Sequence, residues 1–269
     1  MSSELLHQIH TLELDLFKHL NTIFEKHDIK YFFIGGSALG AVRHNGFIPW
    51  DDDIDIGIPR EDYERFLALC KNELSDRYLL QEPGFGCPSG FAKIRIKDTL
   101  YVEKSTCHLD INHGVFLDIF PLDGVPSDEK LRAKHLKAVK RQILITTACF
   151  INPNALSGFA KKTFAKLCAL LLNGDKQNLK LQKLMKKYPY EQSEIIANYT
   201  GAWWTKEMMP RSIMGDGTMF EFEGISVRIP EDYHLYLTNL YKDYMCLPPE
   251  EKRISHHGIV EIKLPPTLQ

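Results

Sequence analysis

The amino-acid sequence predicts an α/β protein, in which a small mixed sheet is flanked by helices. Three observations predict this class. Short apolar runs and one stretch of alternating polar and apolar residues are typical of strands, and apolar residues at helical spacing precede and follow them. A long basic segment between them has the pattern of continuous helix. We expect residues 1–269 to form a single domain that includes a helical subdomain at about 125–190.

The elements follow from local patterns in chain order. Apolar residues recur every three or four positions near the N-terminus, Gly35-Gly36-Ser37 separates an apolar run from a helix, and Pro59 is suited to a helix start. The basic segment divides near Asn152-Pro153 and Asn173-Gly174. The predicted elements are helices at 4–27, 38–43, from 59, three within 128–188 and one from 231, and strands at 31–34, 53–58, 78–81, 91–97, 115–120, 195–200, 218–222 and 225–229, with the tail from 247 as loop.

Composition narrows the class of protein. A hydrophobic content of 44% and a charged content of 25% are ordinary for a globular chain. The six cysteines have no metal-ligand spacing, which favours reduced thiols and a cytoplasmic protein. The N-terminal segment lacks the basic and apolar regions of a signal peptide, and the longest apolar runs, 143–151 and 167–172, are shorter than the ~20 residues of a membrane-spanning helix.

The charge is unevenly distributed along the chain. Residues 130–188 contain fourteen Lys or Arg and a single acid, Asp175, which gives this segment a net charge of +13. The overall charge is −2, so the remaining residues together carry −15. The imbalance predicts an anionic partner for the basic helices. Basic amphipathic helices suit an anionic membrane surface, and a packed subdomain with a solvated lysine face is the alternative. Nucleic acid is disfavoured because aromatic residues for base stacking are not interleaved with the lysines.

Paired carboxylates are the strongest candidates for chemistry. In a strand, Asp53 and Asp55 would share one face, where two carboxylates repel each other unless a cation lies between them. Asp118 is a third acid, in the apolar run Gly114–Pro121, and a buried Asp needs a partner. Mg²⁺ accepts such ligands together with phosphate oxygens. The alternatives are a solvated acidic turn and, for Asp118, a structural cap; an EF-hand is excluded by Ile56 at loop position 6.

The glycine turn lies one helix and one loop before these acids. Glycines let the backbone approach a phosphate, and a helix N-terminus offers unpaired N–H groups to an anion. The turn Gly35-Gly36-Ser37 is therefore a candidate for phosphate binding. Alone, such a turn indicates an ordinary strand-to-helix connection. Its combination with the paired aspartates is a specific signal of a phosphate-binding site.

The stretch from Gly35 to Ile56, GGSALGAVRHNGFIPWDDDIDI, closely resembles the signature of the LicD family. Phe91-Ala-Lys-Ile-Arg, Phe116-Leu-Asp-Ile-Phe-Pro and Leu247-Pro-Pro-Glu-Glu-Lys-Arg also resemble that family and follow in its order. The resemblance covers roughly 25–125 and 235–258. It implies a nucleotidyltransferase-like fold, Asp53 and Asp55 as the metal-binding DxD, Asp118 as the later strand carboxylate, and Gly36 and Ser37 as the phosphate-facing turn.

The resemblance also implies an activity. Bacterial LicD proteins transfer phosphocholine from CDP-choline to sugars of teichoic acid or lipopolysaccharide precursors, and relatives similar to fukutin and fukutin-related protein transfer ribitol phosphate from CDP-ribitol. We expect a Mg²⁺- or Mn²⁺-dependent phosphotransferase that uses a CDP-activated donor and a sugar or lipid-linked glycan acceptor of the cell envelope, releases CMP, and works in the cytoplasm or peripherally at the inner face of the membrane. Alternatives are another CDP-linked polyol phosphate, nucleotidyl transfer with release of pyrophosphate, and a non-catalytic membrane-surface protein.

Further basic residues are candidates for substrate binding. Lys93 and Arg95 are two positions apart on a predicted strand and could clamp diphosphate oxygens, with a solvated strand face as the alternative. Arg43 and His44 precede the acidic loop, and Arg253 lies in the polar tail. The remaining candidates, for each of which packing or solvent exposure is the alternative, are Trp50, His256 and His257, with Tyr101, Trp203, Trp204 and Tyr233 available for a cationic donor group.

Overall fold

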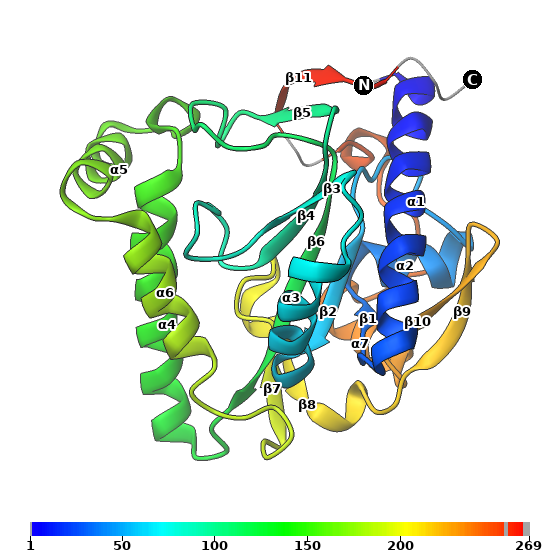
Figure 1. The fold of residues 1–269 in the computed structure, drawn as a ribbon. Helices are drawn as coiled ribbons and strands as arrows, with labels where there is room; N and C mark the ends of the chain where they lie inside the picture. The colour runs from blue at the N-terminus through cyan, green and yellow to red at the C-terminus, as the bar shows by residue number, and fades with distance from the viewer. Residues whose placement is uncertain (1, 256–257, 266–269) are drawn as a thin grey trace.

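The computed structural model describes residues 2–255 and 258–265, and confirms a mixed α/β architecture with a curled sheet and helices around it. Figure 1 shows three layers: α1 (Ser3–His27) on one side, the sheet in the middle, and α4 (Glu129–Phe150) with its neighbouring helices on the other side. In the part of the chain that the structure describes, no helix combines the length and the apolar character needed to cross a bilayer.

The central sheet has seven strands. Five of them lie side by side in the order β1 (Phe32–Phe33), β2 (Asp55–Pro59), β6 (Phe116–Val125), β4 (Ala92–Ile96) and β3 (Tyr78–Gln81). The far end of the long strand β6 also pairs with β7 (Ile195–Ala197), which pairs with β8 (Met208–Pro210). All ten residues of β6 are buried, and this strand is the central strand of the sheet.

One pair of neighbouring strands runs parallel, and it positions the acidic residues. β2 and β6 are paired in the register Asp55 opposite Asp118, and β4 pairs antiparallel with β6 in the register Lys93 opposite Asp118. Residues opposite one another in adjacent strands point to the same face of a sheet. Three charged side chains from three strands therefore meet in one row across the sheet.

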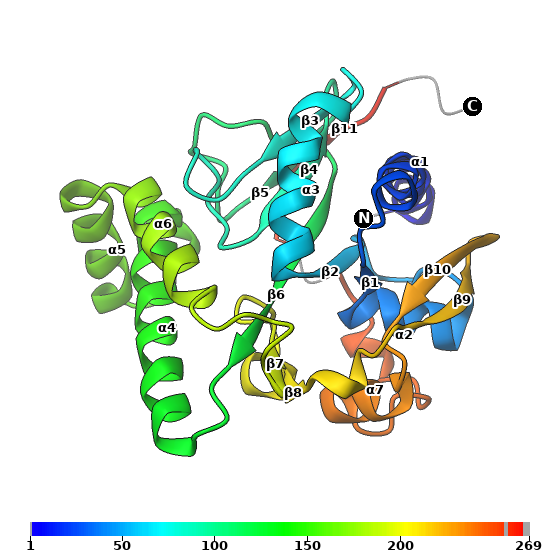
Figure 2. The same ribbon diagram turned by 60° about the horizontal axis from the view of Figure 1, so that its bottom comes forward.

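Helix α1 and one further helix cover the same side of the sheet, and another helix begins at the glycine turn. α1 is capped by Ser2, whose Oγ accepts a hydrogen bond from the N–H of Leu5, and it buries an apolar stripe against the sheet. The other two helices are α2 (Gly35–His44) and α3 (Arg60–Glu73), which directly follows β2 and packs on β2 and β6. Figure 2 shows α3 lying along the sheet between α1 and the basic helices.

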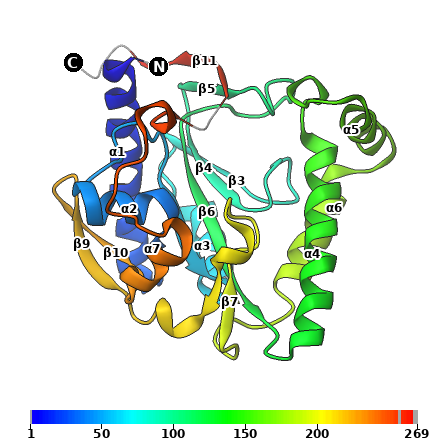
Figure 3. The same ribbon diagram turned by 180° about the vertical axis from the view of Figure 1, so that it is seen from behind.

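The basic segment forms three helices: α4, α5 (Phe159–Leu171) and α6 (Gly174–Met185). Asp128 caps α4 and Asn173 caps α6, each accepting a hydrogen bond from a backbone N–H three residues on. Helices α4 and α6 pack on the far ends of β6 and β7 around a small hydrophobic cluster that is separate from the main core. The buried residues of this cluster are Val125, Val139, Leu181, Met185, Ala197 and Tyr199. Figure 3, from behind, shows α4 and α6 standing beside the sheet and α5 at the outer corner.

The remaining elements lie around the central sheet. They are the hairpin of β9 (Thr218–Phe222) and β10 (Ile225–Ile229), the helix α7 (Tyr233–Tyr241), the two-stranded pair of β5 (Leu100–Glu103) and β11 (Ile259–Lys263), and the 3-10 turns Pro153–Ala155, Trp204–Glu207, Arg211–Ile213 and Glu250–Lys252. Strand β10 packs against β1, while α7 and β9 pack against α2.

Several sequence predictions needed correction. The tail from 247 is not wholly loop, because 259–263 pairs with β5 as strand β11. The predicted strand at 53–58 begins only at Asp55, so Asp53 lies in the segment that leads into it. The strands β5 and β8 were not predicted, and α2 begins at Gly35 rather than Ala38. Short strands such as β5 acquire their conformation from a distant partner, which local periodicity does not reveal.

Candidate active site

Three carboxylates from two neighbouring strand segments converge at the centre of the sheet. Ligand atoms of Asp53, Asp55 and Asp118 all lie within 4.8 Å of one another. Asp118 is buried, and the pKa of Asp55 is raised well above its usual range, first by burial and then by the charges of Asp53 and Asp118. Carboxylates held together under these conditions are stabilised by a shared cation.

The donor set fits a hard divalent cation. Mg²⁺ is bound by oxygens at about 2.1 Å, so two oxygens on one ion lie at most about 4.2 Å apart. The ligand atoms of the three carboxylates lie within 4.8 Å of one another, which is compatible with one shared ion, and they provide oxygen ligands without sulfur or nitrogen. Asp53, Asp55 and Asp118 are thus the residues that could hold Mg²⁺ or Mn²⁺, as the DxD pattern predicts.

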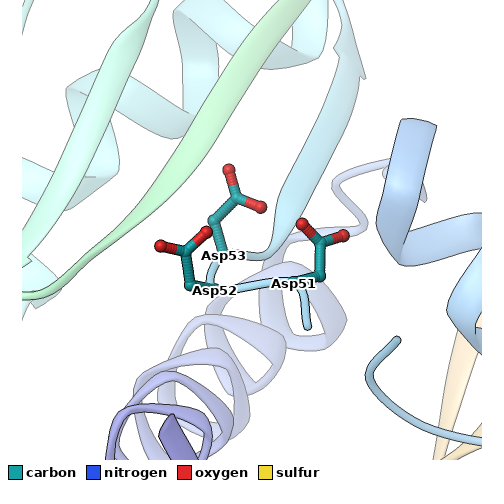
Figure 4. A group of neighbouring side chains, drawn as sticks. All are labelled: Asp51, Asp52 and Asp53. Carbon is teal, nitrogen blue, oxygen red and sulfur yellow. The ribbon is translucent and has the colours of Figure 1, made fainter. Parts of the chain in front are cut away.

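A second group of acids, Asp51, Asp52 and Asp53, lies in the segment that enters β2, and ligand atoms of these three are also within 4.8 Å of one another. Figure 4 shows their carboxylates directed to the same side of the segment. Asp52 is buried and accepts hydrogen bonds from the hydroxyls of Tyr101 and, at 2.6 Å, Ser255. These two hydroxyls fix the loop and so fix the approach of Asp53 to the site.

The glycine turn contacts the same acids. Gly35 has φ +54, a conformation that other residues rarely adopt. A Cβ at Gly36 would overlap Oδ2 of Asp51, so the backbone there approaches the carboxylate as closely as it can. The Ser37 hydroxyl is buried and accepts a hydrogen bond from the N–H of Asp55 at 2.8 Å. The turn therefore holds both ends of the acidic segment against the N-terminus of α2, whose partial positive charge favours carboxylates and phosphates.

Lys93 and Arg95 are both buried, so the alternative interpretation, in which they form a solvated strand face, is wrong. The Lys93 ammonium lies 2.9 Å from Oδ1 of Asp118 and 3.3 Å from the centre of the Phe116 ring. The Arg95 guanidinium donates to Oε1 of Gln81 at 2.6 Å and lies deeper in the protein. Lys93 is therefore part of the acidic row, whereas Arg95 is held by neighbouring strand residues.

Arg43, His44 and Arg253 form a separate group at the C-terminal end of α2. Nε of Arg43 donates to Nε2 of His44 at 2.9 Å, and Nη1 donates to the carbonyl of Tyr244 at 2.7 Å. The Arg253 guanidinium lies 5.7 Å from the centre of the Trp50 ring, and His44 meets the edge of the same ring. Burial, and then the charge of Arg43, lower the pKa of His44. These residues join the C-terminal segment to α2; His256 and His257 lie outside the described residues.

A cavity of about 340 Å³ opens beside the acidic row, between the sheet and the basic helices. Lys93 and Asp118 line it, and so does Glu103 of β5. The aromatic residues of its lining are Phe91, Phe150, Tyr199 and Trp204. Of the four aromatic residues considered for a cationic donor group, Trp204 is the one that lines this cavity, while Tyr101 is bound to Asp52. Trp203 packs against Tyr241, and Tyr233 packs against Phe220.

Comparison with known proteins identifies the family. The family described as LicD/FKTN/FKRP, nucleotidyltransferase domain, matches residues 28–165. The lipopolysaccharide cholinephosphotransferase LicD of Haemophilus influenzae is 31% identical over 260 residues, which are 91% of this chain and 92% of that protein. The chain belongs to the LicD family. It is accordingly a phosphotransferase with a nucleotidyltransferase-like fold.

Two shorter matches agree with this membership. An uncharacterized protein of Rickettsia prowazekii is 36% identical over 86 residues, 25% of this chain and 32% of that protein. The human ribitol 5-phosphate transferase FKRP is 50% identical over 40 residues, 15% of this chain and 8% of that protein. The similarity to FKRP is therefore restricted to a short segment.

The structure places two further acids near the candidate site that sequence reasoning missed. Glu13 of α1 is buried, its Oε2 has no hydrogen-bond partner among the described residues, and burial and the nearby Asp53 raise its pKa well above the usual range. A signal was available, because Glu13 falls on the apolar stripe of the helix, four residues after Ile9 and three before Leu16.

The second added acid is Glu207, which had no comparable signal. Its carboxylate accepts a hydrogen bond from the N–H of Trp203 at 2.9 Å and fills the space beside Gly201, where a Cβ would overlap it. Burial raises its pKa to about 7. Glu207 thus supports the turn that carries Trp204 into the cavity, and only the tertiary structure reveals this role.

Proposed function

We propose that this chain transfers phosphocholine from CDP-choline to a sugar of a cell-envelope glycan, a lipopolysaccharide or teichoic acid precursor, and releases CMP. The observation that carries the proposal is the convergence of Asp53, Asp55 and Asp118 in a chain that is similar over 91% of its length to a lipopolysaccharide cholinephosphotransferase. A diphosphate donor presents negative charge, which an uncompensated row of carboxylates would repel. The donor and the acids therefore require positive charge between them.

The three carboxylates would hold one or more Mg²⁺ or Mn²⁺ ions, which neutralise the diphosphate when they are bound. Lys93 compensates part of the negative charge around Asp118, from which its ammonium is 2.9 Å away. The glycine turn forms the N-terminus of α2, where the N–H of Gly35 donates to the Tyr236 hydroxyl at 3.0 Å, and Gly36 and Ser37 follow it in the first turn, in keeping with their proposed roles in phosphate binding. Positioning and charge compensation are the main requirements of phosphoryl transfer.

The reaction exchanges one P–O bond for another. The acceptor hydroxyl attacks the phosphorus that carries choline, a new bond forms between the sugar oxygen and that phosphorus, and the bond from the phosphorus to the CMP oxygen breaks. CMP departs with the bonding electron pair. We assign Asp118 as the group that takes the hydroxyl proton, because it lies in the acidic row and also lines the cavity that would receive the acceptor.

The assay that tests the proposal follows CMP release from CDP-choline in the presence of Mg²⁺ and a purified envelope glycan. We expect turnover that chelation abolishes and that Asp55→Asn removes, whereas the matched variant Asp15→Asn, at an exposed acid of α1, retains it. Activity of Asp55→Asn equal to that of Asp15→Asn would contradict the proposal.

Two other donor chemistries can be separated from this one. The short similarity to a ribitol 5-phosphate transferase favours a CDP-linked polyol as the second candidate donor. A thermal-shift comparison of CDP-choline, CDP-ribitol and CDP-glycerol, each with Mg²⁺, ranks these donors. Release of pyrophosphate from CTP, instead of CMP from a CDP-alcohol, would identify nucleotidyl transfer.

We further propose that the protein acts in the cytoplasm at the inner face of the membrane, where a lipid-linked glycan would be presented. The support is the net charge of +13 on residues 130–188, which form the helices α4, α5 and α6. Positive charge on a surface attracts anionic lipid headgroups.

A further inference from the structure

Helix α5 exposes large apolar side chains that ordinary surface helices bury. Phe159 is 86% exposed, Leu170 80% and Leu171 72%. Phe164 and Leu167 are also exposed. Five large apolar residues in a helix of thirteen residues thus face solvent, whereas a surface helix of a globular protein usually presents its polar residues there.

The exposed apolar residues share one side of the helix. Phe164, Leu167 and Leu171 follow the spacing of three and four residues that places side chains on one face, and Phe159 and Leu170, three turns apart, extend it. The buried residues of α5 are Ala165 and Cys168, and the carbonyl of Cys168 lies 3.8 Å from Sγ of Cys149 in α4. Small residues therefore attach α5 to the protein, and large ones point away from it.

Lysines accompany the apolar face. Lys161, Lys162 and Lys166 lie in the same three turns, and α5 contains no acidic residue. The whole segment 130–188 has Asp175 as its single acid. An apolar face with basic residues around it matches an anionic lipid surface, because the apolar side chains enter the acyl boundary while the ammonium groups remain among the headgroups.

We infer that α5 is an interfacial anchor that lies in the plane of an anionic lipid bilayer. At thirteen residues the helix is about 20 Å long, which is suited to lying on the surface and too short to span it. The inference deepens the proposed function, on which it rests for the assumption that the acceptor is lipid-linked. It assigns the membrane contact to α5 in particular, since the apolar exposure of the segment is concentrated there.

The anchor is placed where it would present an acceptor to the acidic row. Phe150 and Ile151, at the C-terminal end of α4, line the cavity that also contains Asp118. The chain passes from these residues through the 3-10 turn Pro153–Ala155 directly to α5. A glycan whose lipid tail remains in the bilayer would therefore leave the membrane close to this cavity.

The inference is tested by co-sedimentation of the full chain with two kinds of vesicle, one of phosphatidylcholine alone and one in which a third of the lipid is phosphatidylglycerol. We expect binding to the anionic vesicles that weakens with salt. Leu170→Asp should weaken that binding roughly tenfold or more, because it places a charge in the apolar face. Met219→Asp, at a 54% exposed apolar residue of β9, is the matched control and should bind as the unchanged protein does.

Each outcome decides the inference. Equal binding by Leu170→Asp and Met219→Asp overturns it, as does equal binding to both kinds of vesicle. If the unchanged chain binds no vesicles but sediments as a dimer that Leu170→Asp dissociates, a second copy covers α5 and the inference is also overturned.

The same variant separates the inference from the proposed function. CMP release with a water-soluble glycan should be unchanged in Leu170→Asp, because α5 contributes no residue to the acidic row or to the lining of the cavity. Vesicle binding without turnover of any CDP-alcohol would refute the proposed function and leave the anchor in place. Turnover without vesicle binding would support the proposed function and refute the anchor.

Discussion

The acidic row and the basic helices carry charge of opposite sign and organise it in opposite ways. Ligand atoms of Asp53, Asp55 and Asp118 lie within 4.8 Å of one another where β2 begins to pair with β6, and backbone and hydroxyl groups fix their segment. The lysines of α4, α5 and α6 are spread over a surface whose own hydrophobic cluster is small. Buried charges in fixed positions suit chemistry on a small group, whereas dispersed surface charge suits attraction to an extended partner.

The largest expected effect comes from the removal of one carboxylate from the acidic row. Asp55→Asn should lower CMP release by roughly a thousandfold or more, since charge stabilisation at the reacting phosphorus is lost. The melting temperature without metal should stay equal or rise, because one of several mutually repelling buried carboxylates is gone. Activity assays and thermal denaturation measure the two. A large fall in melting temperature would mean that Asp55 is structural.

A buried ion pair links the strand that contains Asp118 to the basic helix α6, and its removal should have the next largest effect. Arg60 donates two hydrogen bonds of 2.7 Å to Asp123 of β6 and a third to Gln182 of α6. Asp123→Asn leaves a buried guanidinium only partly compensated and should cost about 3–5 kcal/mol of unfolding free energy. Asp15→Asn, at the exposed pair with Arg77, should cost less than about 1 kcal/mol. Urea denaturation compares them, and equal losses would refute the distinction.

Glu207 should make the stability of the acidic half depend on pH. Its pKa is about 7 in the folded protein against a usual 4.5, so the folded state retains a proton that the unfolded state releases in this interval. Stability should therefore fall as the pH rises from about 4.5 to about 7, by roughly 3 kcal/mol in total. Glu207→Gln should remove this part of the pH dependence, which denaturation at several pH values measures. An unchanged slope would contradict the assignment.

The smallest effect concerns the approach of the glycine turn to the acids. Gly36→Ala forces apart the backbone and the Asp51 carboxylate, and should cost about 1–3 kcal/mol of stability together with part of the activity. Gly258→Ala is the control, because a Cβ there would meet only ordinary contact at 3.8 Å. Thermal denaturation and CMP release compare the two variants, and identical behaviour would show that the close approach does not matter.

The sequence predicted the parts of this site that depend on local patterns. The helix at 4–27, the division of the basic segment into three helices, and the hairpin strands at 218–222 and 225–229 are confirmed because periodicity and turn residues determine them. The family signature indicated Asp53, Asp55 and Asp118 together, and the structure brings all three to one place.

What the sequence did not reveal depends on contacts between distant segments. Strand β11 forms only against β5, and the roles of Tyr101 and Ser255 exist only because both reach Asp52. Glu207 acquires its raised pKa from burial that no local pattern encodes. Such features are products of the tertiary structure, so a single sequence without its fold contains no direct sign of them.

The pairing of β5 with β11 has a practical consequence for anyone who handles this protein. Ile262 lies opposite Tyr101, and Ser255 shares Asp52 with the Tyr101 hydroxyl, so strand β11 and Ser255 support the acidic loop although they are far from it in the sequence. A purification tag or fluorescent fusion attached directly behind β11 would be tethered beside the acidic loop.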